Sequence, residues 1–480
     1  MNGLNSIKAA LGTKRAYRAA MAAAVLLICF LSFFRLDVDS CEWDEARHGI
    51  SAYEMIKRND YLVTTYEYEP DYWNLKPMLS EYLIVLGYRL FGYNMWGLRF
   101  FSAFLWVALM GLYSRFAGKK YGKAAALLVL LLGSCTYRMN MWHGIRVGNA
   151  DMLHVFLSGV SMLALLEYDG QKPGWLYAAC LCFSLDFLAK SFHAGVLALE
   201  IIVFVLLYDR ALLKKPLRVG ICLFCALAPI LLWGGLRYAR DGMTFLQSMY
   251  TVDVNARGTT VIENRNGGVL FYLWRMFADT LCLGAGLAFS ANCALRKENP
   301  LRDRHTTVML LYIVLPIFLY TLAVSKLTWY TYTMYPAFIL LAARCLPLLA
   351  RAGSEKKRKA ALLLCTLLLL SAFVINLSSV LTVKSDAKKD ELMLSGQALS
   401  AYRGSGVYGF SRDDVGQIEA LMLEWQGDLV PKRGAREAWQ RDAAGLMLVE
   451  KKDFSSLGEW NVPFEYVFHG EMYAIVRHSH

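Results

Sequence analysis

The stretch CEWDEARHGI, residues 41–50, concentrates acidic and basic side chains directly after one of the most apolar segments of the chain. Its titratable residues include Glu42, Asp44, Glu45, Arg47 and His48. A carboxylate in such a place can accept a proton from a hydroxyl group, which is general-base chemistry. Acids also suit the positive end of a helix dipole, where they cap the first turn. The residues alone leave both interpretations open.

The composition indicates that the lipid bilayer is the main solvent of this chain. The 480 residues are 56% hydrophobic and 13% aromatic, which is typical of a polytopic membrane protein. The first apolar run follows basic residues, as in a signal peptide, but no small-residue cleavage site comes after it, so we expect a retained helix. Apolar windows predict about eleven spanning helices. They lie near residues 17–36, 97–114, 122–138, 151–167, 174–189, 192–208, 217–236, 269–294, 307–324, 328–349 and 359–381.

The distribution of Lys and Arg predicts how these helices are oriented. Basic residues accumulate in short cytoplasmic loops, and most of the loops on one side of this layout are basic. These loops are residues 115–123, 167–174, 209–218, 296–305 and 351–359. The net charge of +12 then reflects membrane topology, and a nucleic-acid partner is not expected. The extracytoplasmic side would hold residues 37–96, 138–151, 190–195, 237–268, 325–330 and everything after 382.

The first outer loop, residues 37–96, contains two predicted helices. Residues 44–57 have apolar side chains at helical spacing, and residues 74–92 have the pattern of an amphipathic helix at the membrane interface. Together the two helices would form a lid on the membrane surface. The eleven cysteines lie almost entirely within predicted spans and match no zinc-site spacing, so we assign them packing roles.

Several motifs resemble those of a known enzyme family. The order DEAR, YEMIKRNDYLV and NLKPMLSEYLIVLGYRLFGYNMWGLRF, within residues 41–101, is similar to the first outer loop of the GT-C glycosyltransferases, especially their aminoarabinose transferase and protein O-mannosyltransferase groups. RVGNADML, FLAKSFHAG and SKLTWYTYTMYPAF resemble later segments of the family. The resemblance implies a mostly α-helical membrane bundle of the GT-C type. It also implies transfer of a sugar from a polyprenyl phosphate to an extracytoplasmic acceptor, which could be a lipid A-like lipid, a glycan or a protein.

The resemblance further implies roles for single residues. Asp44 matches the family's general base, with Glu45 as the neighbouring candidate, and an inverting single displacement is expected. Lys76 matches the family's phosphate-contacting lysine. Other predicted outer segments carry groups that could stabilise the phosphate leaving group, or could simply extend to the membrane interface. These are Arg47, Arg146, Lys190, Lys326 and Tyr330.

The chain departs from the family pattern at positions that bear on a metal site. Leu75 stands where the aminoarabinose enzymes carry Glu, which argues against a metal site that relies on that Glu. His143, Asp151 and His48 could contact substrate or metal, although isolated His residues in loops are more often ordinary polar groups. No cofactor is certain, and a divalent metal is left open. Ser191 replaces the family's glycine after Lys190.

A membrane transporter is the main alternative from another functional class. Glu200 and Asp279 fall inside predicted spans, where acids are costly and often mark ion pathways or helix pairs. Asp186 lies close enough to an outer helix end to reach water. However, the sequence has no repeated half and no pair of interrupted spans in matching positions, which transporters with inverted repeats contain.

The residues after the last span have the composition of a soluble chain. GVYGF, GLMLVEKKDF, FEYVFHG and EMYAIVRH have the patterns of strands, and DVGQIEALMLEW that of an amphipathic helix. We therefore predict a transmembrane module over residues 1–382 and a small extracytoplasmic α/β domain over residues 383–480. The expected location is the inner (plasma) membrane, with the active site outside.

Overall fold

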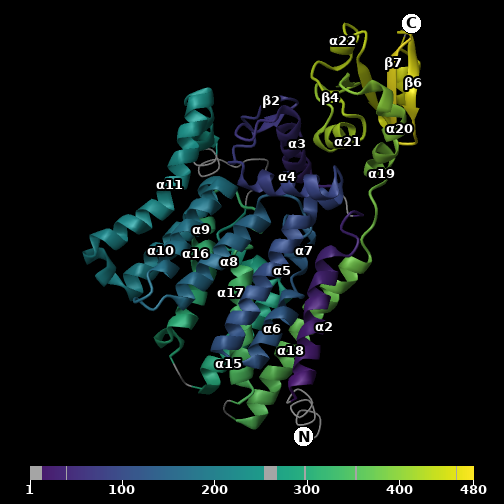
Figure 1. The fold of residues 1–480 in the computed structure, drawn as a ribbon. Helices are drawn as coiled ribbons and strands as arrows, with labels where there is room; N and C mark the ends of the chain where they lie inside the picture. Colours follow the sequence, from purple (N-terminus) through teal and green to yellow (C-terminus); the bar gives the residue numbers. More distant parts are fainter. Residues whose placement is uncertain are drawn as a thin grey trace.

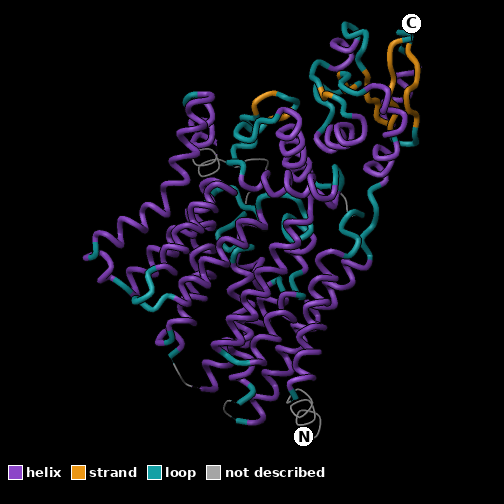
Figure 2. The backbone as a smooth tube through the Cα atoms, in the orientation of Figure 1, coloured by secondary structure: helices purple, strands orange, loops and turns teal. Residues whose placement is uncertain are grey.

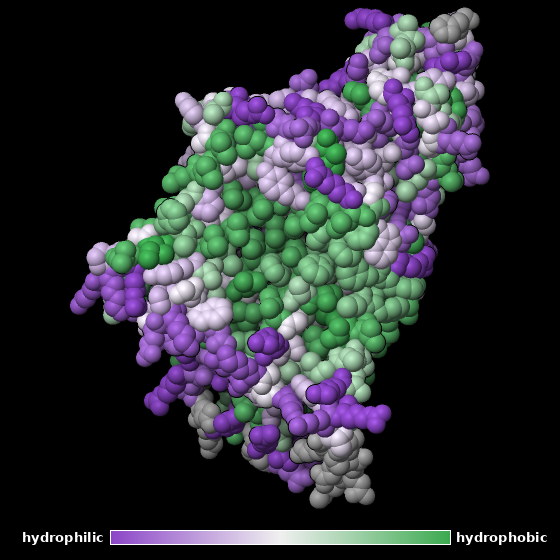
Figure 3. All heavy atoms as spheres, viewed as in Figure 1, coloured by the Kyte–Doolittle hydropathy of each residue, from purple (hydrophilic) through white to green (hydrophobic). Residues whose placement is uncertain are grey.

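The computed structural model describes residues 13–38, 41–252, 267–296, 299–351, 354–460 and 462–479. Long helices form a bundle, and a smaller α/β region that holds the C-terminus lies at the end opposite the N-terminal helix (Figure 1). In the described part of the chain, most of the strands lie in this C-terminal region, and one short hairpin lies near the top of the bundle (Figure 2). Hydrophobic residues form a band across the middle of the visible face, with polar residues above and below it (Figure 3). The chain is therefore a multi-pass membrane protein.

Each predicted span overlaps a helix of the bundle. The helices are α2 (Lys14–Phe33), α5 (Met95–Lys120), α6 (Lys123–Gly133), α8 (Asp151–Glu167), α9 (Gly174–Lys190), α10 (Gly195–Tyr208), α11 (Pro216–Asp241), α14 (Phe271–Phe277), α15 (Thr280–Arg296), α16 (Arg304–Leu322), α17 (Met334–Leu349) and α18 (Glu355–Leu381). Two short helices, α7 (Tyr137–Met141) and α12 (Thr244–Met249), lie in connections. Part of the predicted outer loop 237–268, namely residues 253–266, lies outside the described residues.

Fewer of these helices than predicted could cross a bilayer on length and composition alone. Six segments of the described chain qualify, and a seventh if α14 and α15 count as one span. One of the six, Gly174–Tyr208, contains both α9 and α10, whereas α6 and α17 are shorter apolar helices. The buried α17 packs against α6, α15 and α16. Helices inside the bundle are covered by other helices, so their hydrophobic length need not match the bilayer.

Two acids of the predicted spans have structural partners that the sequence did not indicate. Asp279 lies at the 84° bend between α14 and α15, where its carboxylate accepts hydrogen bonds from the backbone N–H groups of Leu281 and Cys282. Asp186 is buried and contacts His154 Nδ1 at 2.7 Å, so it does not reach water as predicted. Glu200 is buried, and neither of its carboxylate oxygens has a hydrogen-bond partner among the described residues.

The basic loops assigned to one membrane side contact one another. Lys120 of the first loop pairs with Glu167 at 3.0 Å, and the Tyr168 hydroxyl donates to Asp209 at the start of the third loop. Arg304 donates to the carbonyl of Leu165, which joins the fourth loop to the second. These contacts gather the first four basic loops at one end of the bundle, as the charge distribution predicts. All eleven cysteines are unpaired, in agreement with packing roles.

The first outer loop consists of α3 (Trp43–Arg58), a hairpin of β1 (Thr65–Tyr66) and β2 (Glu69–Pro70), and α4 (Leu79–Phe91). The helix predicted over 44–57 is confirmed as α3. The helix predicted over 74–92 begins only at Leu79. Pro77 disfavours helical backbone at the residue before it, so Lys76 lies in an irregular segment and not on a helix.

The C-terminal region has a five-stranded mixed sheet in the order β4-β3-β5-β7-β6. Its strands are β3 (Gly406–Gly409), β4 (Val430–Pro431), β5 (Leu446–Glu450), β6 (Phe464–His469) and β7 (Tyr473–His478), and its helices are α19 (Ala387–Leu394), α20 (Gly396–Leu399), α21 (Gln417–Gly427), α22 (Ala435–Trp439) and α23 (Phe454–Gly458). β3 is parallel to β4 and β5, whereas β7 is antiparallel to β5 and β6. The four predicted strands and the predicted helix are confirmed, and β4 was missed.

Helix α21 packs directly on α3, so the C-terminal region covers the first outer loop. Gly49 makes this approach possible, because a Cβ atom there would lie 3.0 Å from the side chain of Leu421. Two acids meet at the contact, and burial raises the pKa of Glu54 to about 7 and that of Glu424 well above its usual value. Lys57 pairs with Asp428 at 2.8 Å at the edge of the same contact. The helix that carries Asp44 is thus held between the bundle and the C-terminal region.

Candidate active site

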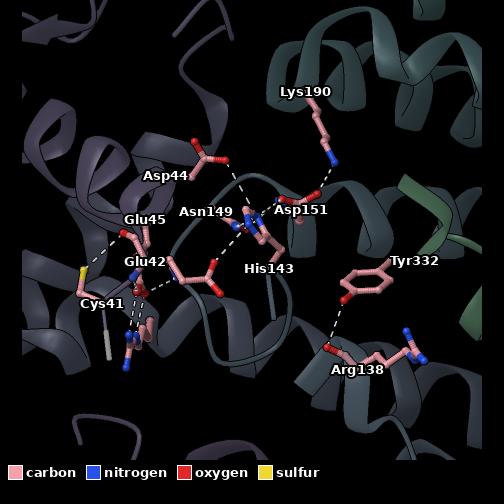
Figure 4. A network of polar contacts seen from close by, with 12 residues as sticks. Cys41, Glu42, Asp44, Glu45, Arg138, His143, Asn149, Asp151, Lys190 and Tyr332 are labelled. Carbon is pink, nitrogen blue, oxygen red and sulfur yellow. Dashed lines mark hydrogen bonds and ion pairs between the residues drawn. The ribbon is translucent and has the colours of Figure 1, made fainter. Parts of the chain in front are cut away.

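A cavity of about 270 Å³ lies where the first outer loop meets the outer ends of several bundle helices. Six of the residues predicted to form the site lie on its wall, although they come from five separate segments of the chain. They are Asp44, Lys76, His143, Asp151, Lys190 and Tyr330. Figure 4 shows Asp44, His143, Asp151 and Lys190 converging from different elements. The tertiary structure therefore brings together most of the polar groups that the sequence singled out.

Asp44 lies in the first turn of α3 and keeps about a third of its side chain exposed. The capping box of α3 is formed by Glu42 and Glu45, so Asp44 is not needed to cap the helix. Its Oδ2 atom lies 4.0 Å from Nδ1 of His143. Asp44 thus presents an accessible carboxylate to the cavity, as a general base requires.

His143 lies at the centre of a cluster of carboxylates. Its Nε2 atom lies 3.3 Å from Glu42 Oε2, and its Nδ1 atom lies 3.5 Å from Asp151 Oδ2. Burial opposes the charged form of the imidazole, but Asp151, Glu42 and Asp44 together raise the pKa of His143 above its usual value. Burial also raises the pKa of Glu42 to about 7, against the opposing effect of His143. The cluster can therefore hold or release protons near neutral pH.

The backbone and the ring of His143 are both constrained. Its φ of 49° lies in the left-handed region, which is uncommon for residues other than glycine. The imidazole stacks on the indole of Trp329 with ring centroids 3.7 Å apart. Asn149 Nδ2 lies 3.2 Å from His143 Nδ1. The ring position is thus set by three segments of the chain.

Two ammonium groups lie on the cavity wall. Lys190, at the end of α9, forms a buried ion pair with Asp151 at the start of α8. Lys76 donates a hydrogen bond of 3.0 Å to the side-chain oxygen of Asn74. Ser191 takes a φ of 58°, a conformation that favours glycine, and in this way ends α9 so that Lys190 reaches the cavity. The departure from the family glycine therefore does not remove Lys190 from the site.

Four predicted site residues do not line this cavity. Glu45 is fully buried and paired with Arg99, and Arg47 pairs with Asp71 at 2.7 Å and faces a second cavity. Arg146 donates to the backbone carbonyls of Phe34 and Arg35, and Lys326 to those of Thr321 and Ala323. His48, a weaker candidate, is buried against Glu81 at 2.6 Å. Each of these partners is remote in sequence or is a backbone atom, which sequence patterns do not reveal.

Sequence reasoning also missed residues of the cavity wall. Glu42 belongs to the quoted acidic stretch but received no role, although it contacts His143. Trp329 belongs to the quoted SKLTWY segment, and His193 follows Lys190 by three residues in FLAKSFHAG. The further missed wall residues are Trp43, Trp73, Asn74 and Leu327. Proximity to the quoted motifs was the only signal that could have found them.

The donor set of the site does not fit a metal ion. Within the described ranges, no group of three or more His, Cys, Asp and Glu side chains has an arrangement that could hold a metal. Leu75, at the position of the family's Glu, supplies an apolar wall to the cavity. Asp151 is already paired with Lys190.

The fold of the whole chain is shared with two solved enzymes. ArnT from Cupriavidus metallidurans, in its structure with undecaprenyl phosphate, superposes with a TM-score of 0.71 at 15% identity, covering 97% of this chain and 98% of ArnT. The oligosaccharyltransferase of Archaeoglobus fulgidus superposes with a TM-score of 0.59 at 10% identity, covering 95% of this chain and 74% of that enzyme. The chain has the GT-C fold. The predicted fold class and the predicted resemblance are therefore confirmed.

Sequence comparisons agree with this GT-C fold. Residues 75–233 match the family model described as dolichyl-phosphate-mannose-protein mannosyltransferase. An uncharacterized protein of Aquifex aeolicus (strain VF5) is 23% identical over 356 residues, which cover 73% of this chain and 68% of that protein. The matched family segment begins at Leu75, beside Lys76, and includes His143, Asp151 and Lys190 of the cavity wall.

Proposed function

We propose that this protein is an integral-membrane glycosyltransferase that moves a sugar from a polyprenyl-phosphate donor to an extracytoplasmic acceptor. The observation that carries the proposal is the convergence of an accessible carboxylate, Asp44, with Lys76 and Lys190 around one cavity. Displacement of a phosphate from a sugar requires a base for the attacking hydroxyl and positive charge for the leaving phosphate, and one cavity wall holds both kinds of group. The shared fold with an enzyme solved with undecaprenyl phosphate supports the same donor class.

In the proposed reaction, Asp44 accepts the proton of the acceptor hydroxyl. The hydroxyl oxygen then forms a bond to the anomeric carbon while the bond from that carbon to the phosphate oxygen breaks. The electron pair of the broken bond remains on the lipid phosphate, and the ammonium group of Lys76 stabilises the charge that develops there. Lys190 adds positive charge, although its pairing with Asp151 reduces it. A single displacement of this kind inverts the anomeric configuration.

A protein O-mannosyltransferase-like reaction is the second candidate. The match of residues 75–233 to the mannosyltransferase family model specifically favours it. The chemistry at Asp44 would be unchanged, and the acceptor would be a Ser or Thr hydroxyl. We propose an inner-membrane location with the cavity on the extracytoplasmic side, because the basic loops lie at the other end of the bundle.

Deletion of the gene should cause one polyprenyl-phosphate sugar to accumulate. Lipid mass spectrometry of membranes from cells with and without the gene would identify this lipid by its mass. Loss of the same sugar mass from a glycolipid, a glycan or a protein would name the acceptor. Unchanged levels of every such lipid, in cells that express the wild-type gene, would contradict the proposed function.

Replacement of Lys76 should weaken binding of the donor phosphate. In Lys76→Met, the apolar stem remains but the charge-assisted hydrogen bond to phosphate is lost, so we expect undecaprenyl phosphate to bind about tenfold more weakly. Native mass spectrometry of the purified chain can measure this binding. Lys451→Met is the matched control, because Lys451 is exposed in the C-terminal region and does not line the cavity, and its binding should stay within about twofold of wild type. Equal binding by wild type and Lys76→Met would remove Lys76 from the donor site.

A further inference from the structure

A second cavity, of about 810 Å³, lies between the hairpin of the first outer loop and the C-terminal region. Its wall includes Tyr66, Glu67 and Trp73 from the outer loop, and Tyr408 and Lys432 from the C-terminal region. Trp73 also lines the cavity that contains Asp44. The two cavities are therefore neighbours that share one indole as part of their walls.

Two buried polar atoms on this wall have no partner within the described part of the chain. They are the hydroxyl of Tyr66, a residue only 5% exposed, and Oε1 of Glu67. The other carboxylate oxygen of Glu67 accepts a hydrogen bond from Arg433 Nε at 2.6 Å. Burial of a polar atom without a hydrogen-bond partner costs free energy. A ligand group that donates a hydrogen bond to Glu67 and accepts one from Tyr66 would remove this cost. A hydroxyl group does both.

The turn of the hairpin holds Glu67 in an uncommon conformation. Glu67 and Tyr68 have φ values of 58° and 61°, and they form the two-residue turn between β1 and β2. Such turns usually contain Asn and Gly, because other residues are strained at positive φ. In this protein, the strained backbone conformation occurs at two residues that line the second cavity.

Aromatic rings supply much of the remaining wall. Trp73 and Tyr72 remain 47% and 37% exposed, which leaves ring faces for a ligand. The guanidinium of Arg47 lies 4.2 Å from the ring centre of Tyr66 and 4.7 Å from that of Trp73, and it holds the two rings in place. The C–H faces of sugars pack on such rings, while their hydroxyls bind planar polar side chains.

The charges of this cavity are largely balanced within the protein. Arg47 makes two hydrogen bonds to the carboxylate of Asp71, and Arg433 is paired with Glu67. Lys432 and Glu69 add one charge of each sign. A site for a phosphate or an acidic chain would present an excess of positive charge. The balance favours a neutral ligand.

We propose that the second cavity binds a neutral glycan chain of the acceptor and guides its reacting hydroxyl past Trp73 to Asp44. This inference rests on the proposed function, and it narrows the acceptor class to a glycan or a glycan-bearing molecule. Tyr66 and Glu67 bind sugar hydroxyls, and the rings of Trp73 and Tyr72 pack against the sugar faces. The C-terminal region thereby becomes part of the acceptor site.

Saturation-transfer difference NMR can test the site with four neutral trisaccharides: maltotriose, cellotriose, mannotriose and chitotriose. The full chain in lipid nanodiscs should bind at least one of them. Tyr66→Phe removes only the unpartnered hydroxyl, so we expect its affinity to fall about tenfold while the fold is retained. Tyr466→Phe is the matched control, since Tyr466 is exposed on β6, at the opposite sheet edge from β4. Its affinity should equal that of wild type.

Three results would contradict the proposed glycan site. They are binding of none of the trisaccharides, equal trisaccharide binding by wild type and Tyr66→Phe, or binding only of a Ser/Thr-containing peptide. Undecaprenyl phosphate binding by the same preparations separates this inference from the proposed function. If wild type and Tyr66→Phe bind that lipid equally but no trisaccharide binds, only the acceptor site is wrong. If wild type does not bind the lipid, the proposed donor chemistry fails as well.

Discussion

Asp44→Asn should lower the rate of sugar transfer by about 10²- to 10⁴-fold, because the amide cannot accept the proton of the acceptor hydroxyl. The protein should fold and insert normally. Asp44 is partly exposed and lies outside the capping box of α3, and Asn has nearly the same shape. The measurement is the initial rate of transfer from the donor lipid that mass spectrometry identifies, divided by the amount of protein in the membrane.

Glu42→Gln is a useful comparison for Asp44→Asn. Glu42 also contacts His143, but it takes part in the capping box and its pKa is raised to about 7 by burial. Part of the Glu42 population is therefore already protonated near neutral pH, and loss of its charge should change transfer far less than Asp44→Asn. Near-normal transfer by Asp44→Asn would end the assignment of Asp44 as the base. A larger loss in Glu42→Gln than in Asp44→Asn would move the role of base to Glu42.

Glu45→Gln should destabilise the protein by about 3–5 kcal/mol, the usual cost of removing one partner of a buried ion pair. Glu45 accepts hydrogen bonds from Arg99 Nε at 2.6 Å and from Arg99 Nη2 at 2.7 Å. It also accepts from the backbone N–H of Gly148 at 2.7 Å. Both side chains are almost completely buried, so the change leaves the Arg99 charge without its carboxylate. A thermal unfolding assay of the purified chain would show a markedly lower midpoint.

The double variant Glu45→Gln with Arg99→Met separates a structural role from a catalytic one. If Glu45 acts through the buried pair, removal of the Arg99 charge should restore part of the lost stability. Transfer by the single variant should fall only as far as the folded fraction falls. A Glu45→Gln protein with wild-type stability and no transfer would contradict the structural role and return Glu45 to the catalytic candidates.

The local elements of this fold could be read from the sequence because they depend on short-range patterns. Hydropathy predicted a helix at each of the bundle positions, and alternating residues predicted strands such as β3 and β5. The basic loops predicted which helix ends gather together, because charge segregates across a membrane. Sequence patterns predicted helix boundaries and spans less well where tertiary packing determines them. Helix α4 starts later than its amphipathic pattern suggests. Short buried helices such as α17 are not long enough to be counted as membrane spans by length.

The sequence indicated the residue types of the candidate site: a carboxylate directly after an apolar segment, with lysines on other segments predicted to lie on the same side of the membrane. Which of the two neighbouring acids faces the cavity depends on packing between distant segments. Successive residues of a helix point in directions about 100° apart, so Asp44 can face the cavity while Glu45 points into the interior. The choice is made by Arg99, 54 residues further along the chain, which binds Glu45 in the interior and leaves Asp44 at the cavity. Local patterns do not contain such a long-range partner, because it is chosen by the packing of α5 against the outer loop.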